Sequence, residues 1–131
     1  MSLGTLQQRY QSTLQELADQ AYYERICLVA AAHNQQQVSY PSHFASLVAV
    51  DSQSFSEDPL QFNYNLENPI EMEAHGIYVR APSSGGKYQL WTGTSFACPH
   101  ISAIVARILS VMPELTPFEI KALLRALRKN R

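Results

Sequence analysis

The sequence carries no strong charge of either sign, little cysteine and no long apolar run. Ten Lys and Arg residues stand against eleven Asp and Glu, which gives a formal net charge of -1. We therefore expect no nucleic-acid partner, because such proteins need a basic surface. Two cysteines provide no disulfide framework. No apolar run approaches the roughly 20 residues of a membrane span, so no membrane partner is expected.

Two further absences concern targeting and metals. The first residues, 1–4, have neither the charged start nor the apolar stretch of a signal peptide. This favours the cytoplasm but leaves the compartment open. No acidic cluster has the spacing of a calcium loop. The residues themselves therefore indicate no metal site and no other cofactor.

Apolar residues make up 46% of the chain, enough for one domain with a core. Thr5 with Gln8 resembles a capping box, and an amphipathic pattern follows it to about Glu24. The apolar runs 26–32 and 46–51 suit strands covered on both faces, and 70–74 alternates as a strand does. Helices interleaved with buried strands predict an α/β fold built on a parallel sheet.

The remaining segments divide into loops, short strands and two further helices. Residues 33–43 predict a loop and the mostly polar residues 52–68 a long surface connection. A short strand is expected at 77–79, residues 82–86 predict a turn, and 88–91 lead into the segment 93–100. Apolar residues recur at helical spacing from Ala97 to Met112. Thr116-Pro117 with Glu119 predicts the start of a last helix. The chain thus opens on a helix without the preceding strand that a βαβ unit needs.

The segment Gly93-Thr94-Ser95-Phe96-Ala97-Cys98-Pro99-His100 has a spacing that chance rarely produces. Because the helical pattern begins at once, Ser95 is expected at or just inside a helix N-terminus. Unpaired N–H groups and the helix dipole favour negative charge there. The simpler interpretation of a serine at this place is an N-cap. Cys98 is a weaker candidate for a reactive residue.

This segment resembles the nucleophile motif of the subtilisin-like serine peptidases, or subtilases. Other segments are similar to subtilase segments and stand in the same order: Ser2-Leu3-Gly4, Ala31-Ala32-His33-Asn34, Tyr40-Pro41, Ala74-His75-Gly76, Gly85-Gly86-Lys87-Tyr88 and Leu115-Thr116-Pro117. The resemblance covers nearly the whole chain. It matches only the C-terminal half or so of a subtilase catalytic domain.

The resemblance implies a fold and a domain organisation. Residues 1–131 would form a single, incomplete domain, the C-terminal portion of the catalytic domain. Its fold would be part of the subtilisin-like parallel-sheet, three-layer architecture, without the N-terminal strands. Members of the family often bind calcium, but no such site is visible in this chain.

The resemblance also implies a function, a serine-type endopeptidase that acts on polypeptides through an acyl-enzyme. Ser95 would be the nucleophile and Asn34 a donor in the oxyanion hole. The expected substrate-binding residues are Ser2, Leu3, Gly4, Ala32, His33 and Thr94. His33 stands where subtilases have a glycine that lines the main specificity pocket, so its ring is expected to reshape that pocket.

The chain lacks the other two members of the catalytic triad, an Asp and a His that precede the serine in subtilases. None of the four histidines fits the role. His33 and His75 replace Gly and Pro, His43 lies in a predicted loop, and His100 is the motif's own histidine, which is not the base. No aspartate has a matching context.

Three hypotheses remain open at this point. In the first, the chain belongs to an intact or complemented serine endopeptidase. In the second, it is a non-catalytic half-subtilase that acts as a binding or structural module. In the third it is an unrelated α/β hydrolase, although Ala97 stands where that family's elbow needs a second glycine. Because a cut sheet exposes a strand edge, we expect a complementing chain or self-association.

Overall fold

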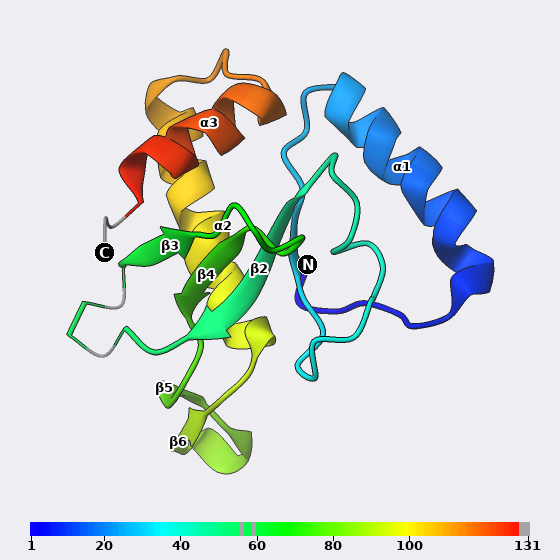
Figure 1. Ribbon diagram of the computed structural model, residues 1–131. Coiled ribbons are helices and arrows are strands. Elements are labelled where there is room, and N and C mark those ends of the chain that lie inside the picture. Colours follow the sequence, from blue (N-terminus) through cyan, green and yellow to red (C-terminus); the bar gives the residue numbers. More distant parts are fainter. Residues whose placement is uncertain (56, 59, 129–131) are drawn as a thin grey trace.

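A four-stranded sheet forms the centre of the molecule in the computed structural model, which describes residues 1–55, 57–58 and 60–128 (Figure 1). The strand order is β1-β2-β4-β3, with β1 at Val29–Ala31, β2 at Val48–Gln53, β3 at Phe62–Tyr64 and β4 at Met72–His75. The first three in this order are parallel, and β3 pairs antiparallel with β4. The predicted α/β class and its parallel sheet are confirmed.

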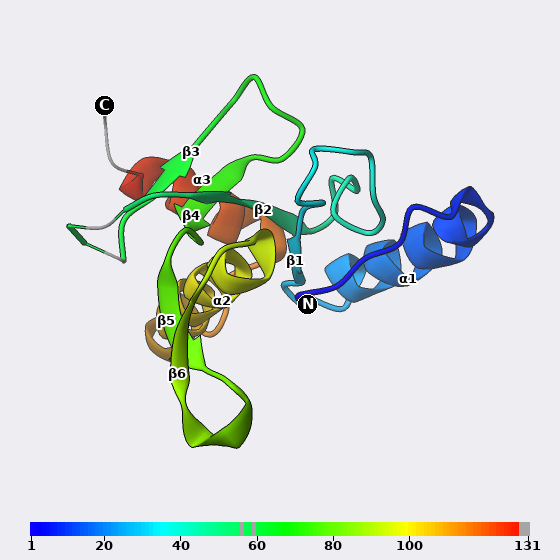
Figure 2. The same ribbon diagram turned by 90° about the horizontal axis from the view of Figure 1, so that it is seen from below.

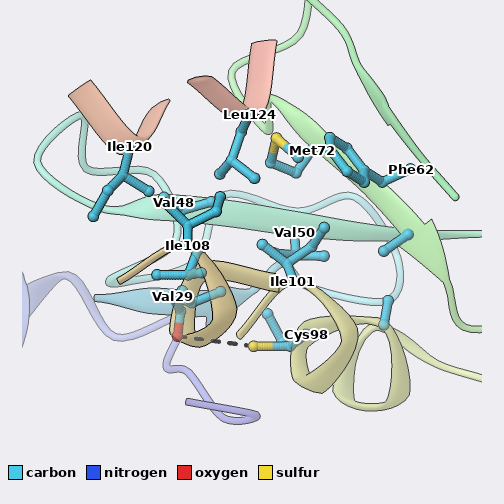
Figure 3. Packing of buried hydrophobic residues seen from close by; sticks show 14 residues of the cluster. Val29, Val48, Val50, Phe62, Met72, Cys98, Ile101, Ile108, Ile120 and Leu124 are labelled. Atoms are coloured by element: carbon cyan, nitrogen blue, oxygen red, sulfur yellow. Dashed lines mark hydrogen bonds between the residues drawn. The ribbon is translucent and has the colours of Figure 1, made fainter. Parts of the chain in front are cut away.

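Side chains alternate between two apolar clusters, one on each face of the sheet. On one face, Val48 and Val50 of β2 pack with α2 (Thr94–Val111) and α3 (Pro117–Leu127), as Figure 3 shows. On the other face, Ala49 joins Ala18 of α1 (Gln11–Tyr23). Helices therefore flank both faces of the sheet, although α1 extends well beyond the edge strand β1 (Figures 1 and 2).

A two-stranded hairpin projects from this core (Figure 2). It consists of β5 (Val79–Pro82) and β6 (Tyr88–Trp91), joined through the short 3₁₀ turn η2 (Ser84–Gly86). The Trp91 ring stacks on Phe96 of α2, with 5.8 Å between centroids. The hairpin is therefore anchored next to the start of α2, at the residue that follows Ser95.

Helix α2 is the core helix that crosses one face of the sheet. By length and composition alone its 18 residues, with a mean hydropathy of 1.3, could also span a membrane, although no apolar run of that length was expected from the sequence. Its packing gives a different explanation. The buried residues Ala97, Cys98, Ile101, Val105 and Ile108 pack against the sheet and α3.

Two local predictions at the helix starts have opposite outcomes. Thr116 and Glu119 form the predicted capping box at α3. The capping box predicted at Thr5 is wrong, because Thr5 pairs with Tyr40 in an isolated antiparallel bridge and its hydroxyl accepts the Gln7 N–H. The first helical turn is instead the 3₁₀ segment η1 at Gln8–Tyr10, followed by α1.

Some strand bounds also differ from the expected ones. The apolar run 26–32 yields only β1, at Val29–Ala31, and the connection 52–68 contains the unpredicted strand β3. This strand has three residues in a polar context and gains its partner only from β4. Tertiary pairing, not local pattern, therefore determines it.

Candidate active site

Ser95 is the second residue of α2, and it is not the N-cap. The N-cap is Gly93, which has no side chain to cap the helix. Ser95 Oγ instead donates a hydrogen bond to the Ser2 carbonyl oxygen at 3.2 Å, and Ser2 Oγ donates to the Ser95 carbonyl oxygen at 3.0 Å. Ser2 and Ser95 are 93 residues apart in sequence, and their segments meet at the candidate nucleophile.

The first residue of the chain explains how Ser2 reaches this position. Met1 lies alongside β1: its carbonyl oxygen accepts the Ala31 N–H at 2.9 Å and its amino nitrogen donates to the Val29 carbonyl oxygen. These bonds flank Ala30 in the pattern of a parallel strand. The segment Ser2-Leu3-Gly4 consequently runs past the carboxyl end of β1, where ligands of parallel sheets usually bind.

Asn34 lies just beyond the same end of β1 and is joined to α2. Its side-chain Oδ1 accepts the backbone N–H of Thr94 at 2.9 Å. Because a backbone N–H can only donate, the atom that meets it must be the amide oxygen. The NH₂ group of Asn34 donates no hydrogen bond to any of the described residues. It is therefore available to donate to a ligand.

Thr94 is buried and holds this arrangement together. Its hydroxyl donates to the Ala32 carbonyl oxygen at 2.7 Å and also lies 3.2 Å from Asn34 Oδ1. Only 1% of the surface of Thr94 is exposed. Its main role is therefore to position Asn34, and it offers little surface to a substrate.

Gly93 is required by both its backbone and its surroundings. Its φ of 155° lies in a region that L side chains rarely adopt, and a Cβ there would lie 3.2 Å from Asn34 Oδ1. The absence of a side chain lets the start of α2 approach Asn34 closely. Gly93 N–H in turn donates to the Gly76 carbonyl oxygen at 2.8 Å.

A cavity of about 200 Å³ adjoins Ser95. All residues expected at the site from the sequence contribute to its lining: Ser2, Leu3, Gly4, Ala32, His33, Asn34, Thr94 and Ser95. Ala31 and Ser39 also line it and were not anticipated. Ser39 is buried with its hydroxyl 2.9 Å from that of Ser42. A serine in a polar loop gives no sequence signal of such a position.

No described group can act as a general base for Ser95 in this structure. Among the described residues, neither an imidazole nor a carboxylate forms a hydrogen bond with Ser95 Oγ, whose proton is directed at a carbonyl oxygen. His33 Nδ1 accepts the Gln35 N–H at 3.3 Å. His43, from the predicted loop, has a buried Nδ1 that forms no hydrogen bond with a described residue.

The other titratable candidates belong to the core. Cys98 is 1% exposed, and its thiol lies 3.8 Å from the Val29 carbonyl oxygen, a contact drawn in Figure 3. Burial raises the pKa of the Cys27 thiol, which keeps it protonated and unreactive. Within the described residues, no three His, Cys, Asp or Glu side chains are grouped to hold a metal ion.

Comparisons with known proteins agree with this geometry. The sequence model of the subtilase family (Peptidase S8) matches residues 1–128. The chain is 29% identical to subtilisin DY of Bacillus licheniformis over 125 residues, covering 91% of this chain and 45% of that protein. It is 33% identical over 124 residues to the thermostable alkaline protease of Halalkalibacterium halodurans, strain C-125, covering 92% and 33%.

Two solved structures share the fold. The S41 psychrophilic protease has a TM-score of 0.74 and 23% identity, covering 96% of this chain and 47% of that chain. Sphericase has a TM-score of 0.77 and 24% identity, covering 96% and 46%. The chain therefore spans less than half the length of these relatives. Since the family model matches all but three of the 131 residues, the chain belongs to the subtilase family.

Proposed function

We propose that residues 1–131 are the nucleophile-bearing part of a serine endopeptidase, the C-terminal portion of its catalytic domain. Ser95 would attack the peptide carbonyl, and Asn34 would stabilise the oxyanion. One observation carries this proposal: Thr94 N–H occupies Asn34 Oδ1 at 2.9 Å, which reserves the amide NH₂ for an acceptor in the cavity that Ser95 also lines.

The chemistry requires a bond between Ser95 Oγ and the carbonyl carbon of the substrate. The hydroxyl proton passes to a base, and the carbonyl oxygen becomes an oxyanion. Collapse of the tetrahedral intermediate returns the proton to the departing amine and leaves an acyl-enzyme, which water then hydrolyses. Asn34 NH₂ and the N–H of Ser95 at the helix start are suitable donors to the oxyanion. In a subtilisin, loss of one such side-chain donor lowers turnover by about 10²–10³.

The substrate would be a polypeptide in an extended conformation. Ser2-Leu3-Gly4 continues from Met1 past the carboxyl end of β1 and would offer backbone groups to an added strand. The cavity between this segment and Ala32-His33 would receive one substrate side chain, with Ser39 at its buried wall.

The base must come from outside these residues. Peptide hydrolysis needs an imidazole oriented by a carboxylate, and the chain spans only 45% of subtilisin DY. An intact or complemented protein would supply both groups. We therefore expect a complementing polypeptide, or a longer chain, as the partner of this part.

A second function is favoured by the hydrogen bond from Ser95 Oγ to the Ser2 carbonyl oxygen. A carbonyl oxygen accepts this bond but cannot remove the proton. The chain by itself would then be a non-catalytic module that binds extended polypeptides or associates with a second copy.

Complementation distinguishes the two functions. The chain would be mixed with the part of subtilisin DY that precedes the matched region, and hydrolysis of a chromogenic peptide would be followed. Hydrolysis that requires both polypeptides and disappears in Ser95→Ala supports the enzyme. Stable association without hydrolysis or fluorophosphonate labelling supports the binding module. The coding sequence upstream of Met1 gives an independent check, because in-frame Asp and His motifs there would complete the triad.

A further inference from the structure

Two histidines meet where strand β4 contacts helix α2. His75 is the last residue of β4, and His100 lies in the second turn of α2. Their ring centroids are 5.8 Å apart with an angle of 71° between the planes. His75 is buried, with 9% of its surface exposed, while His100 is partly exposed. The pair therefore forms part of the contact between the sheet and the helix that carries Ser95.

The hydrogen bonding of His75 requires its neutral form. Its Nδ1 accepts the Phe55 N–H at 3.2 Å, so that nitrogen carries no proton and the ring proton is on Nε2. Burial, and secondly the charge of His100, lowers the pKa of His75. A second proton on the ring would eliminate the bond from Phe55 and place charge beside His100.

Gly76, the residue after His75, connects the contact between His75 and His100 to the turn before Ser95. The Gly76 carbonyl oxygen accepts the Gly93 N–H at 2.8 Å. A Cβ on Gly76 would lie 2.7 Å from Ser52 Cβ and 2.9 Å from the Gly93 carbonyl oxygen. With so little free space, a displacement of His75 must move Gly76 and, through it, the turn that precedes Ser95.

We propose that the His75–His100 pair is an acid-sensitive latch that holds β4 against the start of α2. With His75 neutral, the Phe55 bond and the ring contact keep Gly76 in place under Gly93. In acid, a proton on His75 Nδ1 removes the acceptor of the Phe55 bond, places charge beside His100 and loosens the contact. Its effect on peptide hydrolysis rests on the proposed function, whereas the latch itself does not.

Other ionisable groups on the neighbouring elements have separate partners. Asp51 on β2 accepts the Ser52 N–H, and Glu73 on β4 accepts from Asn63. Asp58, in the loop between β2 and β3, accepts the Leu60 N–H. Glu57 in that loop is exposed, as is Arg107, two turns beyond His100 on α2. Among the described residues, His100 is the group whose charge shifts the pKa of His75.

The direction of the effect follows from proton linkage. A histidine with a pKa below its ordinary value binds fewer protons in the folded state than in the unfolded state. Its contribution to stability is complete above the ordinary pKa of about 6.5 and is lost as the pH falls through the lower pKa of the folded state. The latch therefore weakens in acid and not in alkali.

The test compares the native chain with His75→Asn at about pH 7.5 and about pH 5, on either side of the ordinary histidine pKa. An asparagine Oδ1 can take the place of Nδ1 as the acceptor for Phe55 N–H, but it does not titrate. Two quantities are measured: the melting temperature and the hydrogen-exchange protection of the Gly93 amide. We expect both to fall in acid for the native chain, and the fall to be much smaller in His75→Asn.

Two more variants complete the design. His100→Gln removes the neighbouring charge and should reduce the acid response of Gly93 protection even if His75→Asn fails to fold. His43→Asn changes a histidine outside the pair and should retain the full response. Equal acid responses in the native chain and His100→Gln, or an unchanged Gly93 protection factor across the pH range in the native chain, would overturn the latch. Neither readout depends on hydrolysis, so failure of the proposed function is distinguishable.

Discussion

The backbone N–H of Thr94 donates to the side-chain oxygen of Asn34 at 2.9 Å, across 60 residues of sequence. This bond joins the end of β1 to the first residue of α2. It fixes which end of the Asn34 amide faces the cavity beside Ser95. The Asn34 amide oxygen thus contributes to stability, while the Asn34 NH₂ group serves the proposed chemistry. Single substitutions can separate these two roles.

Asn34→Asp and Asn34→Ala form a matched pair for this separation. Asp retains an oxygen for Thr94 N–H but has no NH₂, whereas Ala loses both. We expect Asn34→Ala to lower the free energy of unfolding by about 0.5–1.5 kcal/mol, the usual net value of one hydrogen bond, and Asn34→Asp to lower it less. Urea unfolding measures both. An equal loss in the two variants would show that the Thr94 bond does not contribute as described.

Gly93→Ala is expected to destabilise the turn before Ser95. The methyl group would lie 3.2 Å from Asn34 Oδ1, at a residue whose φ is 155°. Gly85→Ala is the control, since Gly85 also has a positive φ, 73°, but its Cβ would meet no atom within 4 Å. Backbone strain alone costs about 1–2 kcal/mol in the left-handed region of Gly85 and about 1–3 kcal/mol in the glycine-only region of Gly93. Thermal unfolding should show a clearly larger loss for Gly93→Ala, and a loss no greater than that of Gly85→Ala would contradict the close approach of Asn34.

Lys121→Met tests the attachment of α3 to the sheet. Lys121 Nζ lies 2.7 Å from Glu71 Oε2 and donates to the carbonyl oxygens of Ala45 and Leu47 at 3.1 and 3.2 Å. Methionine preserves the packing of the stem but leaves these acceptors unpaired, at an expected cost of about 1–3 kcal/mol in the free energy of unfolding.

The companion variant Glu71→Gln retains an oxygen acceptor for Lys121 and should cost less. Chemical denaturation of both variants gives the comparison. If Lys121→Met is as stable as the native chain, the ammonium does not hold α3 in this way.

Thr116→Ala removes the cap of α3 and should also change the response to acid. Glu119 has a pKa below its ordinary value because the backbone N–H and the hydroxyl of Thr116 donate to its carboxylate. The stability that these two bonds contribute is present above the ordinary pKa of a glutamate. It disappears as the pH falls through the lower pKa of Glu119 in the folded state. The cap itself contributes about 1 kcal/mol.

Thr116→Ser, which retains the hydroxyl, is the control for this change. Melting curves should show a deficit for Thr116→Ala near neutral pH that narrows in acid, and none of comparable size for Thr116→Ser. A deficit in Thr116→Ala that is independent of pH would exclude the carboxylate bond as its source.

The site residues were expected from the resemblance to subtilases, and in the structure they line one cavity. General physics placed only Asn34, just beyond the carboxyl end of a parallel strand, where ligands of such sheets usually bind. The cap at Thr116 was predictable because it is local. The features that were not predicted depend on partners that are distant in sequence. Strand β3 forms by pairing with β4, and Thr5 forms a β-bridge with Tyr40 instead of capping a helix.

The position of Ser39 illustrates the same limit within the site. Its place on the cavity wall results from the path of the loop after Asn34, which no local pattern encodes. The contact between His75 and His100 is likewise invisible in sequence, since 25 residues separate them and only the packing of α2 on the sheet joins them.

Fluorophosphonate labelling of the purified chain tests the central claim most directly, because the reagent modifies serines whose hydroxyl is activated by a base. The described residues offer Ser95 Oγ only the Ser2 carbonyl oxygen. We expect the chain alone to label no more than its Ser95→Ala variant. Labelling of the native chain that Ser95→Ala abolishes would contradict it and would mean that these 131 residues contain the base.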